Sequence, residues 1–432
     1  MLASIQKNNM KKFIVTIIVS TTIFCFCSFL QGQDKKTDLP RFAVISDIHF
    51  GNNRGMGPMI KVPNALRNIS GKERLDALFI VGDLTDSGKE FEYNLLLKVF
   101  ADKKNVPAEL AVYFMMGNHD HFNKSVDTDK MYMKKLQQPL HQYIEIKGYP
   151  FVTISPSNDG YCNDTKKFLS EKLAISVQKY PDKPIFVFVH HPPANTCYGS
   201  TAGNWGSDAL SSIFANYPQV IVFCGHSHLP IGDPRSIHQD KFTTVNDGST
   251  TYTGVEAGEI SKTSVHPENF DNITEGLIVN VLQNGDIEIE RWDTFRNEEI
   301  LPKWKVESPH NGNNFTYKNH KDSQAPKFIE GENPVVSDFA DDSCVVTFPQ
   351  AKDNEIVHHY LVEVVDEDQV IASVKKCSQF YLNSWMPTEL SVRLSKLPAD
   401  KKLTARITAI DSYKNNSTAI QSEPFSLTKT KK

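Results

Sequence analysis

Five short apolar runs, separated by stretches of helical periodicity, dominate the first half of the chain. They have the length of strands and are apolar throughout, without the alternation that marks a half-exposed strand. The runs are Phe42–Ser46, Ala77–Val81, Ala111–Met116, Ile185–Val189 and Val220–Cys224. Helical periodicity is found at Phe91–Phe100, Lys130–Gln137, Thr165–Gln178 and Ser207–Ala215. Continuous apolar strands that alternate with helices predict an α/β domain with a buried and largely parallel sheet.

Three later apolar segments follow one another without an intervening helix. They are Phe242–Val245, Gly276–Val281 and Ile287–Asp293. Consecutive strands joined by short connections pair antiparallel. We therefore expect these segments to be antiparallel additions, and we expect the domain, over residues 38–298, to contain more than one sheet.

The pattern changes towards the C-terminus. Residues 299–325 are polar and rich in Asn, Lys and His, which predicts a linker or a poorly ordered extension of the first domain. From residue 326 to 429, short alternating strands recur with turn residues between them and no helix. These strands are Ser343–Phe348, His358–Val365, Gln369–Val374, Leu390–Leu394, Leu403–Ile410 and Phe425–Leu427. The pattern is typical of an all-β sandwich of about a hundred residues.

The first 32 residues have the pattern of a secretory signal peptide. Lys11 and Lys12 precede the apolar run Phe13–Leu30, and the polar stretch QGQDKKTD follows it. An uncleaved membrane anchor is the alternative, because the run is almost long enough to cross a bilayer. We expect an exported protein that is periplasmic, attached to the cell surface or secreted, with membrane contact only through this segment if it is uncleaved.

Composition and charge narrow the choice of partners. The 432 residues are 40% hydrophobic and 23% charged, which is ordinary for a soluble protein of two domains. The net charge of -4 provides no basic field for nucleic acid, so no nucleic-acid partner is expected. Five cysteines remain outside the N-terminal segment, so at least one is unpaired or pairs between chains.

A polar residue able to bind a metal ion follows each of the five apolar runs. Because the carboxyl ends of parallel strands share one edge of a sheet, these residues are expected to meet there. Each motif alone is a weak signal, but five in succession predict a metal site. In chain order the residues are Asp47 and His49, Asp83 and Asp86, Asn118 and His119, His190, and His226 and His228.

The order of motifs DxH, GDxxD, GNHD, HxP and GHxH resembles the calcineurin-like metallophosphoesterase superfamily. The resemblance covers about Arg41 to Asp293 and implies a four-layer α/β/β/α sandwich with two sheets. Further along, the stretches VTFPQAKDNEIVHHYLVEV and ARITAIDSYKNNS resemble a fibronectin type III domain.

The resemblance to the phosphoesterases also implies a role for each site residue. His119 would be the general acid, oriented by Asp86. His190 is preferred over His191, because the family's ligand stands two residues before the proline. The first metal ion would be held by Asp47, His49, Asp83 and His228, and the second by Asp83, Asn118, His190 and His226, with Asp83 bridging.

Mixed oxygen and imidazole ligands suit two divalent or trivalent transition metal ions, either Mn, Fe, Zn or Ni. Purple acid phosphatases resemble the same scheme but have Tyr at the last position of GDxxD and Gly at the last position of DxH. Asp86 and His49 stand there in this chain, which argues against an iron–tyrosinate enzyme.

These features predict an exported, binuclear-metal-dependent phosphoesterase that hydrolyses small phosphodiesters or phosphomonoesters. Metal-activated hydroxide would attack phosphorus and His119 would protonate the leaving group. Two alternatives are a catalytically inactive surface or binding protein and a nuclease, the latter disfavoured because no basic tract interleaved with aromatic residues occurs.

Residues outside the motifs leave several roles open. Arg54 is a candidate for binding phosphate oxygens. Asn195, Tyr198 and Trp205 either contact the substrate or pack their own loop. The C-terminal domain could bind carbohydrate or protein, or serve as a spacer.

Overall fold

The alternation of side chains along the strands explains why two sheets stack face to face. In β1 (Arg41–Ile45), Phe42 and Val44 pack between the two sheets, whereas Ala43 and Ile45 pack against helices. Both faces of the strand are therefore buried, which is why its sequence is apolar throughout. The computed structural model describes residues 38–54, 57–201 and 205–428, and residues 39–432 belong to one structural unit. The predicted signal peptide, residues 1–32, lies outside the described residues.

The first sheet has the strand order β12-β11-β10-β1-β2-β3. Strands β1, β2 and β3 are parallel, and β10, β11 and β12 continue the sheet as antiparallel strands. The predicted antiparallel additions are thus found at β10 and β11. Beyond β1, the bounds are β2 (Ala77–Val81), β3 (Ala111–Met115), β10 (Glu275–Val281), β11 (Ile287–Asp293) and β12 (Glu298–Val306).

The second sheet has the order β4-β5-β6-β7-β9-β8, in which β5, β6, β7 and β9 are parallel. The prediction that Phe242–Val245 is an antiparallel addition is wrong, because β9 runs parallel to β7. The connection of residues 225–242 is long enough to return the chain to the end of the sheet at which β7 begins, so that β9 can run parallel to β7. Strand β8 forms within this connection. The bounds are β4 (His141–Ile146), β5 (Tyr149–Ile154), β6 (Ile185–Val189), β7 (Val220–Cys224), β8 (Ile237–Gln239) and β9 (Thr243–Asn246).

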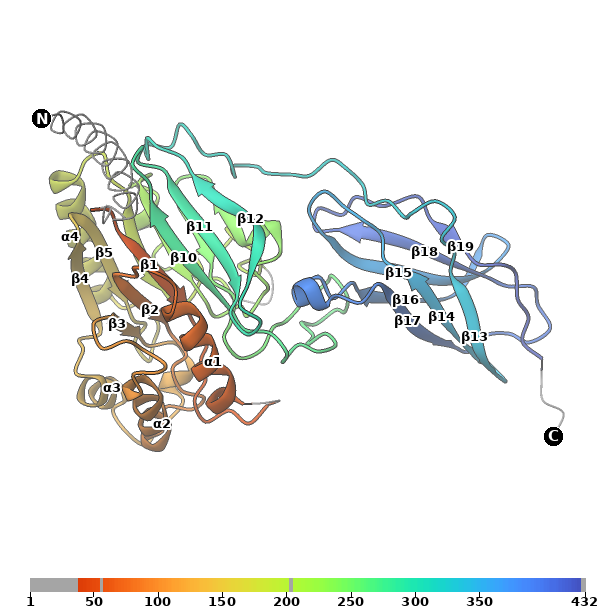
Figure 1. Cartoon of the computed structure of the whole chain (residues 1–432), viewed down its shortest axis with the longest axis horizontal. Helices are drawn as coiled ribbons and strands as arrows, with labels where there is room; N and C mark the ends of the chain where they lie inside the picture. Colours follow the sequence, from red (N-terminus) through yellow and green to blue (C-terminus); the bar gives the residue numbers. More distant parts are fainter. Residues whose placement is uncertain (1–37, 55–56, 202–204, 429–432) are drawn as a thin grey trace, which may run out of the picture. The chain divides into compact units, whose positions relative to one another are not determined.

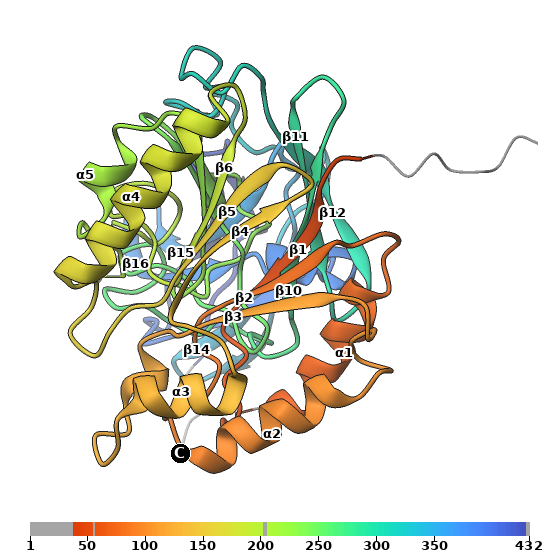
Figure 2. The same ribbon diagram turned by 90° about the vertical axis from the view of Figure 1, so that its left-hand side faces the viewer.

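Helices cover the outer face of each sheet, so the layer order is α/β/β/α as predicted (Figures 1 and 2). Helices α1 (Pro58–Ser70), α2 (Glu90–Ala101) and α3 (Thr128–Leu136) pack on the first sheet. Helices α4 (Asn163–Lys179) and α5 (Ser211–Phe214) pack on the second. Helix α1 was not expected, because the prolines Pro58 and Pro63 mask its periodicity. Pro58 stands at the first helical position, where proline is tolerated, whereas Pro63 lies inside the helix.

Part of the predicted linker is ordered differently from the expectation. Residues 299–306 form most of β12, whose Ile300, Trp304 and Val306 point into the core between the sheets. The strand was missed because Pro302 and the exposed Leu301 interrupt its alternation. Within residues 307–325 the structure shows no helix or strand, but the segment contacts the α/β domain: His310 Nε2 lies 2.8 Å from the carbonyl of Gly285, and the amide of Tyr317 donates to Gln239.

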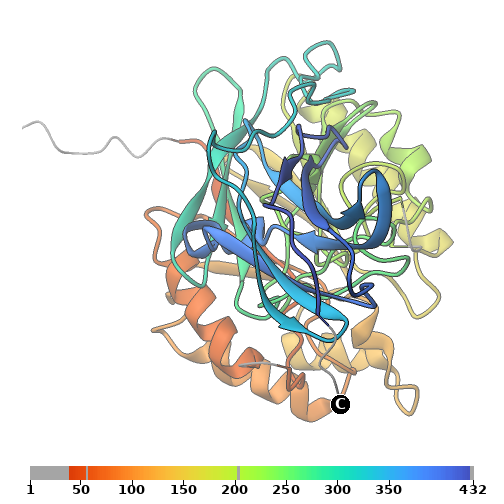
Figure 3. The same cartoon turned by 90° about the vertical axis from the view of Figure 1, so that its right-hand side faces the viewer.

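The C-terminal residues form the predicted all-β sandwich (Figure 3). One sheet has the order β13-β14-β17 and the other β16-β15-β18-β19, and all neighbouring strands are antiparallel. Phe425–Leu427 is not a strand; Phe425 makes only a bridge to Leu403. The bounds are β13 (Val335–Ala340), β14 (Ser343–Pro349), β15 (Val357–Asp366), β16 (Gln369–Cys377), β17 (Glu389–Ser395), β18 (Thr404–Asp411) and β19 (Ile420–Gln421).

The five cysteines of the described residues are all free thiols. None of the helices in the described ranges combines the length and the apolar character required to cross a bilayer.

A buried carboxyl at the start of β10 makes stability depend on pH. Burial raises the pKa of Glu275 to about 8, despite the hydrogen bond that its Oε2 accepts from the amide of Ile231. Between 4.5, the ordinary pKa of a glutamate, and about 8, the folded protein keeps a proton that the unfolded chain releases, so this group's contribution to stability falls as pH rises. We expect E275Q to flatten the decline in unfolding free energy by about 1.4 kcal/mol per pH unit in this window.

Chemical denaturation at pH 5.5, 7 and 8.5 measures this difference. The matched control is E109Q, which alters an exposed carboxyl and should track the wild type. Parallel curves for E275Q and the wild type would contradict the expectation.

Candidate metal centre

The predicted ligands leave their strands in strained backbone conformations. Asp47, His49 and Asp83 follow β1 and β2 with φ of 54°, 40° and 48°, and His226 and His228 follow β7 with φ of 68° and 54°. Left-handed backbone is costly for residues other than glycine and persists only where the surroundings enforce it. Here the backbone amide of Asp47 donates to the backbone carbonyl of Gly82 (3.1 Å), and the amide of His49 donates to the backbone carbonyl of Asp83 (2.9 Å). The loops after β1 and β2 therefore stabilise each other's conformation.

Glycines let the backbone approach the site closely. A Cβ atom at Gly82 would overlap the ring of His190, and one at Gly117 would overlap the carboxylate of Asp83. A Cβ at Gly225 would overlap the side chains of Ser46 and Asp47. These three positions therefore accept no larger residue without displacing a predicted ligand.

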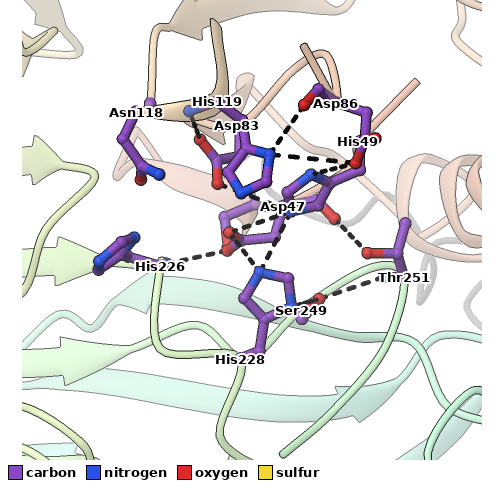
Figure 4. A network of polar contacts seen from close by, with 12 residues as sticks. Asp47, His49, Asp83, Asp86, Asn118, His119, His226, His228, Ser249 and Thr251 are labelled. Atoms are coloured by element: carbon purple, nitrogen blue, oxygen red, sulfur yellow. Dashed lines mark hydrogen bonds and ion pairs between the residues drawn. The ribbon is translucent and has the colours of Figure 1, made fainter. Parts of the chain in front are cut away.

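The first predicted ligand group is brought together (Figure 4). Ligand atoms of Asp47, His49, Asp83 and His228 all lie within 4.8 Å of one another. His228 Nε2 is 3.0 Å from Asp47 Oδ1, and His49 Nε2 is 3.6 Å from Asp83 Oδ2. All four side chains are buried, so this is an enclosed site and not a chance surface cluster.

The second predicted group lies beside the first and shares Asp83 with it. Asp83, His190 and His226 offer ligand atoms within 4.8 Å of one another. His190 Nε2 is 3.3 Å from Asp83 Oδ1 and 3.1 Å from Asn118 Oδ1. Because one oxygen of Asp83 faces His49 and the other faces His190, this carboxylate is placed to bridge two ions.

Backbone carbonyls orient two of the imidazoles. His190 Nδ1 lies 2.9 Å from the carbonyl of Val81, and His228 Nδ1 lies 3.0 Å from that of Tyr252. A carbonyl can only accept, so each Nδ1 carries the proton and each Nε2 is left to face the centre. Such outer contacts fix the tautomer that a metal ligand needs.

The donor set fits bound cations. The Nε2 atoms of His49 and His228 lie 3.2 Å apart, and Asp47 Oδ1 lies 3.0 Å from His228 Nε2. Two imidazole nitrogens this close repel unless a proton or a cation lies between them. The buried carboxylate of Asp47 likewise needs a positive partner. Two metal ions would satisfy both requirements.

The pKa shifts of these side chains also indicate a site that suits bound cations. Burial opposes the ionisation of Asp47, but His228 and His190 outweigh it and hold its pKa well below the usual range. Burial also opposes the charged form of His190, yet the carboxylates of Asp83 and Asp47 raise its pKa to about 10. Burial likewise opposes the charged form of His228, but Asp47 raises its pKa. Without metal the site therefore stores protons on His190 and His228, and metal binding releases them.

Asp86 contacts His119 differently from the expectation. His119 Nδ1 is 2.9 Å from the backbone carbonyl of Asp86 but 4.0 Å from its carboxylate. The carboxylate instead accepts from Asn52 Nδ2 (2.8 Å) and lies 3.5 Å from His49 Nδ1. The predicted orientation of His119 is thus achieved by the main chain, while the Asp86 side chain faces a ligand imidazole.

Residues beyond the motifs were only partly anticipated. Tyr198 is buried and packs its loop, whereas the Trp205 ring lies 5.1 Å from that of His226. Asn195 lines a pocket bordered by His238 and Phe242, none of them predicted ligands.

Sequence reasoning missed Tyr252, whose ring stacks on His228 at 4.2 Å. It lies 24 residues beyond His228 in a loop without periodicity, so no local pattern marks it. The Arg54 guanidinium lies 5.0 Å from the Tyr252 ring and 3.3 Å from His266 Nε2. Because Tyr252 stacks on His228, this cation lies near the part of the site that contains His228.

Comparison with known proteins identifies the first domain. Residues 40–230 match the family model described as calcineurin-like phosphoesterase. This part of the chain is similar to the calcineurin-like phosphoesterases. The matched range contains every predicted ligand and His119, and the buried cluster suits the binuclear metal centre expected of the family.

Distant matches among solved structures were found for both parts of the chain. A purple acid phosphatase from yellow lupin (Lupinus luteus) seeds aligns at 12% identity and a TM-score of 0.44, over 62% of this chain and 54% of that one. The chain thus spans about half the length of that phosphatase. The fn3 domain of the human collagen alpha-1(XX) chain aligns at 17% identity and a TM-score of 0.19, over 26% of this chain and 95% of that one. No relative was found among curated proteins.

Metal content tests the ligand assignment in the phosphoesterase domain. Because Asp83 belongs to both groups, D83A should lose both ions, whereas H190A should keep the ion of the first group. H191Q is the control, since His191 belongs to neither group although it is adjacent to His190. Elemental analysis after gel filtration gives ions per chain. One ion retained by D83A, or ions lost by H191Q, would contradict the assignment.

Proposed function

We propose that the protein is an exported, binuclear-metal-dependent phosphoesterase that hydrolyses small phosphodiesters or phosphomonoesters. The observation that carries the proposal is the convergence of seven predicted ligands from five strand ends around one shared carboxylate, Asp83. The predicted signal peptide supports export to the periplasm, the cell surface or the medium.

Bound metal ions would supply Lewis acidity and an activated water at neutral pH. Asp47 and Asp83 contribute two negative charges, fewer than the charge of two divalent ions, so the loaded site would attract a phosphate group. Arg54 adds a guanidinium at the edge of the site, where it can pair with phosphate oxygens. We assign it to substrate binding and not to the chemical step.

His119 is the proposed proton donor to the leaving group. Its Nδ1 is held by the carbonyl of Asp86, so Nε2 is the atom free to transfer a proton. The imidazole is partly exposed, as a group that meets the substrate must be. The Phe122 ring lies 4.4 Å away and is 51% exposed, so an apolar surface adjoins the position of the leaving alcohol. This arrangement favours a substrate with an apolar or aromatic leaving group.

Two alternative functions, a catalytically inactive binding protein and a nuclease, can be distinguished from a phosphoesterase by experiment. A catalytically inactive binding protein of the same fold would keep the metal but turn over no ester. A nuclease would cleave DNA, for which the chain's net charge of -4 offers no broad basic surface.

A hydrolysis panel tests the proposed activity. Protein stripped of metal and reloaded with Mn, Zn or Fe should hydrolyse a bis-aryl phosphodiester, an aryl phosphomonoester or a cyclic nucleotide, and a chelator should abolish the reaction. Double-stranded DNA should remain intact. Silence on every small ester with both metal ions loaded would establish the binding protein instead, and DNA cleavage would establish the nuclease.

Replacing His119 tests its role as acid. H119Q should lower kcat about 10²- to 10⁴-fold while metal content stays at the wild-type level, because only proton transfer is removed. The loss should be larger for an alkyl ester than for a p-nitrophenyl ester, whose leaving group needs no proton. H141Q, which alters a histidine of β4 outside the ligand groups, is the matched control. Equal losses of metal and turnover would show His119 to be a ligand.

A further inference from the structure

Tyr198 lies in the loop that follows the ligand His190, yet it makes contacts away from the metal centre. It is 4% exposed, and its hydroxyl donates to Glu259 Oε2 at 2.5 Å. The same hydroxyl lies 3.1 Å from His358 Nε2, and the Arg235 guanidinium covers the ring at 4.0 Å. A buried tyrosine whose hydroxyl and ring are both engaged supports structure and does not contact substrate.

Glu259 connects this loop to the β-sandwich. Its Oε2 is 3.0 Å from Nε2 of His358, which belongs to β15 and is 1% exposed, and its Oε1 is 2.6 Å from Arg235 Nη1. Burial opposes the ionisation of Glu259, but His358 and Arg235 hold its pKa well below the usual range. Removing one partner of such a buried charge is strongly destabilising to the local arrangement.

A second contact ties the same network to the sandwich. Arg235 forms a two-point pair with Asp233, through Nε at 2.9 Å and Nη2 at 2.7 Å. Asp233 Oδ2 also accepts from Ser412 Oγ at 3.0 Å, just beyond the end of β18. The sandwich therefore contacts this charge network at two places, within β15 and directly after β18.

The other side of the loop packs on the turn that carries two ligands. Gly199 follows Tyr198, and a Cβ there would overlap the side chain of Leu229 and lie 3.0 Å from Ser227 Cβ. Ser227 stands between His226 and His228 in sequence. The amide of Tyr198 also donates to the carbonyl of Arg235 at 2.9 Å, so the loop has little freedom to withdraw.

We propose that the β-sandwich supports the metal centre, and that His358 is a positioning residue that holds residues 194–201 against the His226–His228 turn through Glu259 and Tyr198. The inference rests on the proposed function in one respect, that metal ions occupy the two ligand groups. Without His358, Glu259 and the Tyr198 hydroxyl each lose one partner, and the loop is held less firmly against the turn. His226 and His228 then hold their ligand directions less firmly, and metal affinity falls.

Metal titration of the full chain tests this role without reference to turnover. The variants are H358A, H358Q and K376M, and Mn²⁺ affinity is measured by calorimetry on chelator-treated protein. K376M is the matched control, because Lys376 pairs with Glu268 across the same two domains but does not reach Tyr198. Thermal melting shows whether each variant folds. We expect H358A to weaken Mn²⁺ binding about tenfold, as loss of outer-shell support does.

H358Q should recover most of the affinity, since its amide can still donate to Glu259, and K376M should match the wild type. Affinity of H358A within twofold of the wild type would overturn the proposal, and so would an equal loss in K376M. If H358A does not fold, Y198F carries the test: a weakened affinity supports the proposal and an unchanged one overturns it. A wild type that binds Mn²⁺ but hydrolyses no ester refutes the proposed activity alone.

Discussion

Two buried carboxylates at the edge shared by the two sheets constrain the rest of the phosphoesterase domain. Asp47 and Asp83 are 0% and 1% exposed, and taking such charges out of water costs several kcal/mol per ion even after relaxation. The imidazoles that surround them offset part of this cost in the absence of metal. The left-handed backbone at Asp47 and Asp83 adds strain in the same place. The fold can keep both the desolvation cost and the backbone strain at Asp47 and Asp83 only if the strands that carry these residues are rigid.

That rigidity comes from aromatic packing between the sheets. The Phe79 ring of β2 stacks on Phe188 of β6 at 4.0 Å, and Phe42 of β1 meets Phe186 of β6 edge-on at 4.9 Å. These pairs join strands of different sheets, so the ends of β1 and β2 are held in register with the end of β6. Ligands that are more than a hundred residues apart in sequence, such as Asp83 and His190, therefore meet within hydrogen-bonding distance.

The sequence predicted those parts of the site that depend on local pattern. A fully buried strand must be apolar, and a polar residue at its end is conspicuous, so the ligand candidates could be found and the layered fold with them. Strand β12 was missed because Pro302 and the exposed Leu301 interrupt its alternation of apolar and polar residues. The sequence predicts that the Asp86 carboxylate orients His119, but in the folded chain the backbone carbonyl of Asp86 makes this contact. Tyr252 could not be found, since its stacking on His228 arises only from tertiary folding.

The boundary with the β-sandwich has an apolar part and a charged part, and the two contribute differently. Val255 and Ile273 of the first domain pack with Phe380 and Tyr381 of the second, and such burial stabilises contact without fixing direction. The buried network of Arg235, Glu259 and His358 is directional, because each hydrogen bond is satisfied in one arrangement only. A passive spacer needs only the apolar part. The additional charged network lies beside the turn that carries His226 and His228, so it links the β-sandwich to the domain that holds the predicted ligands.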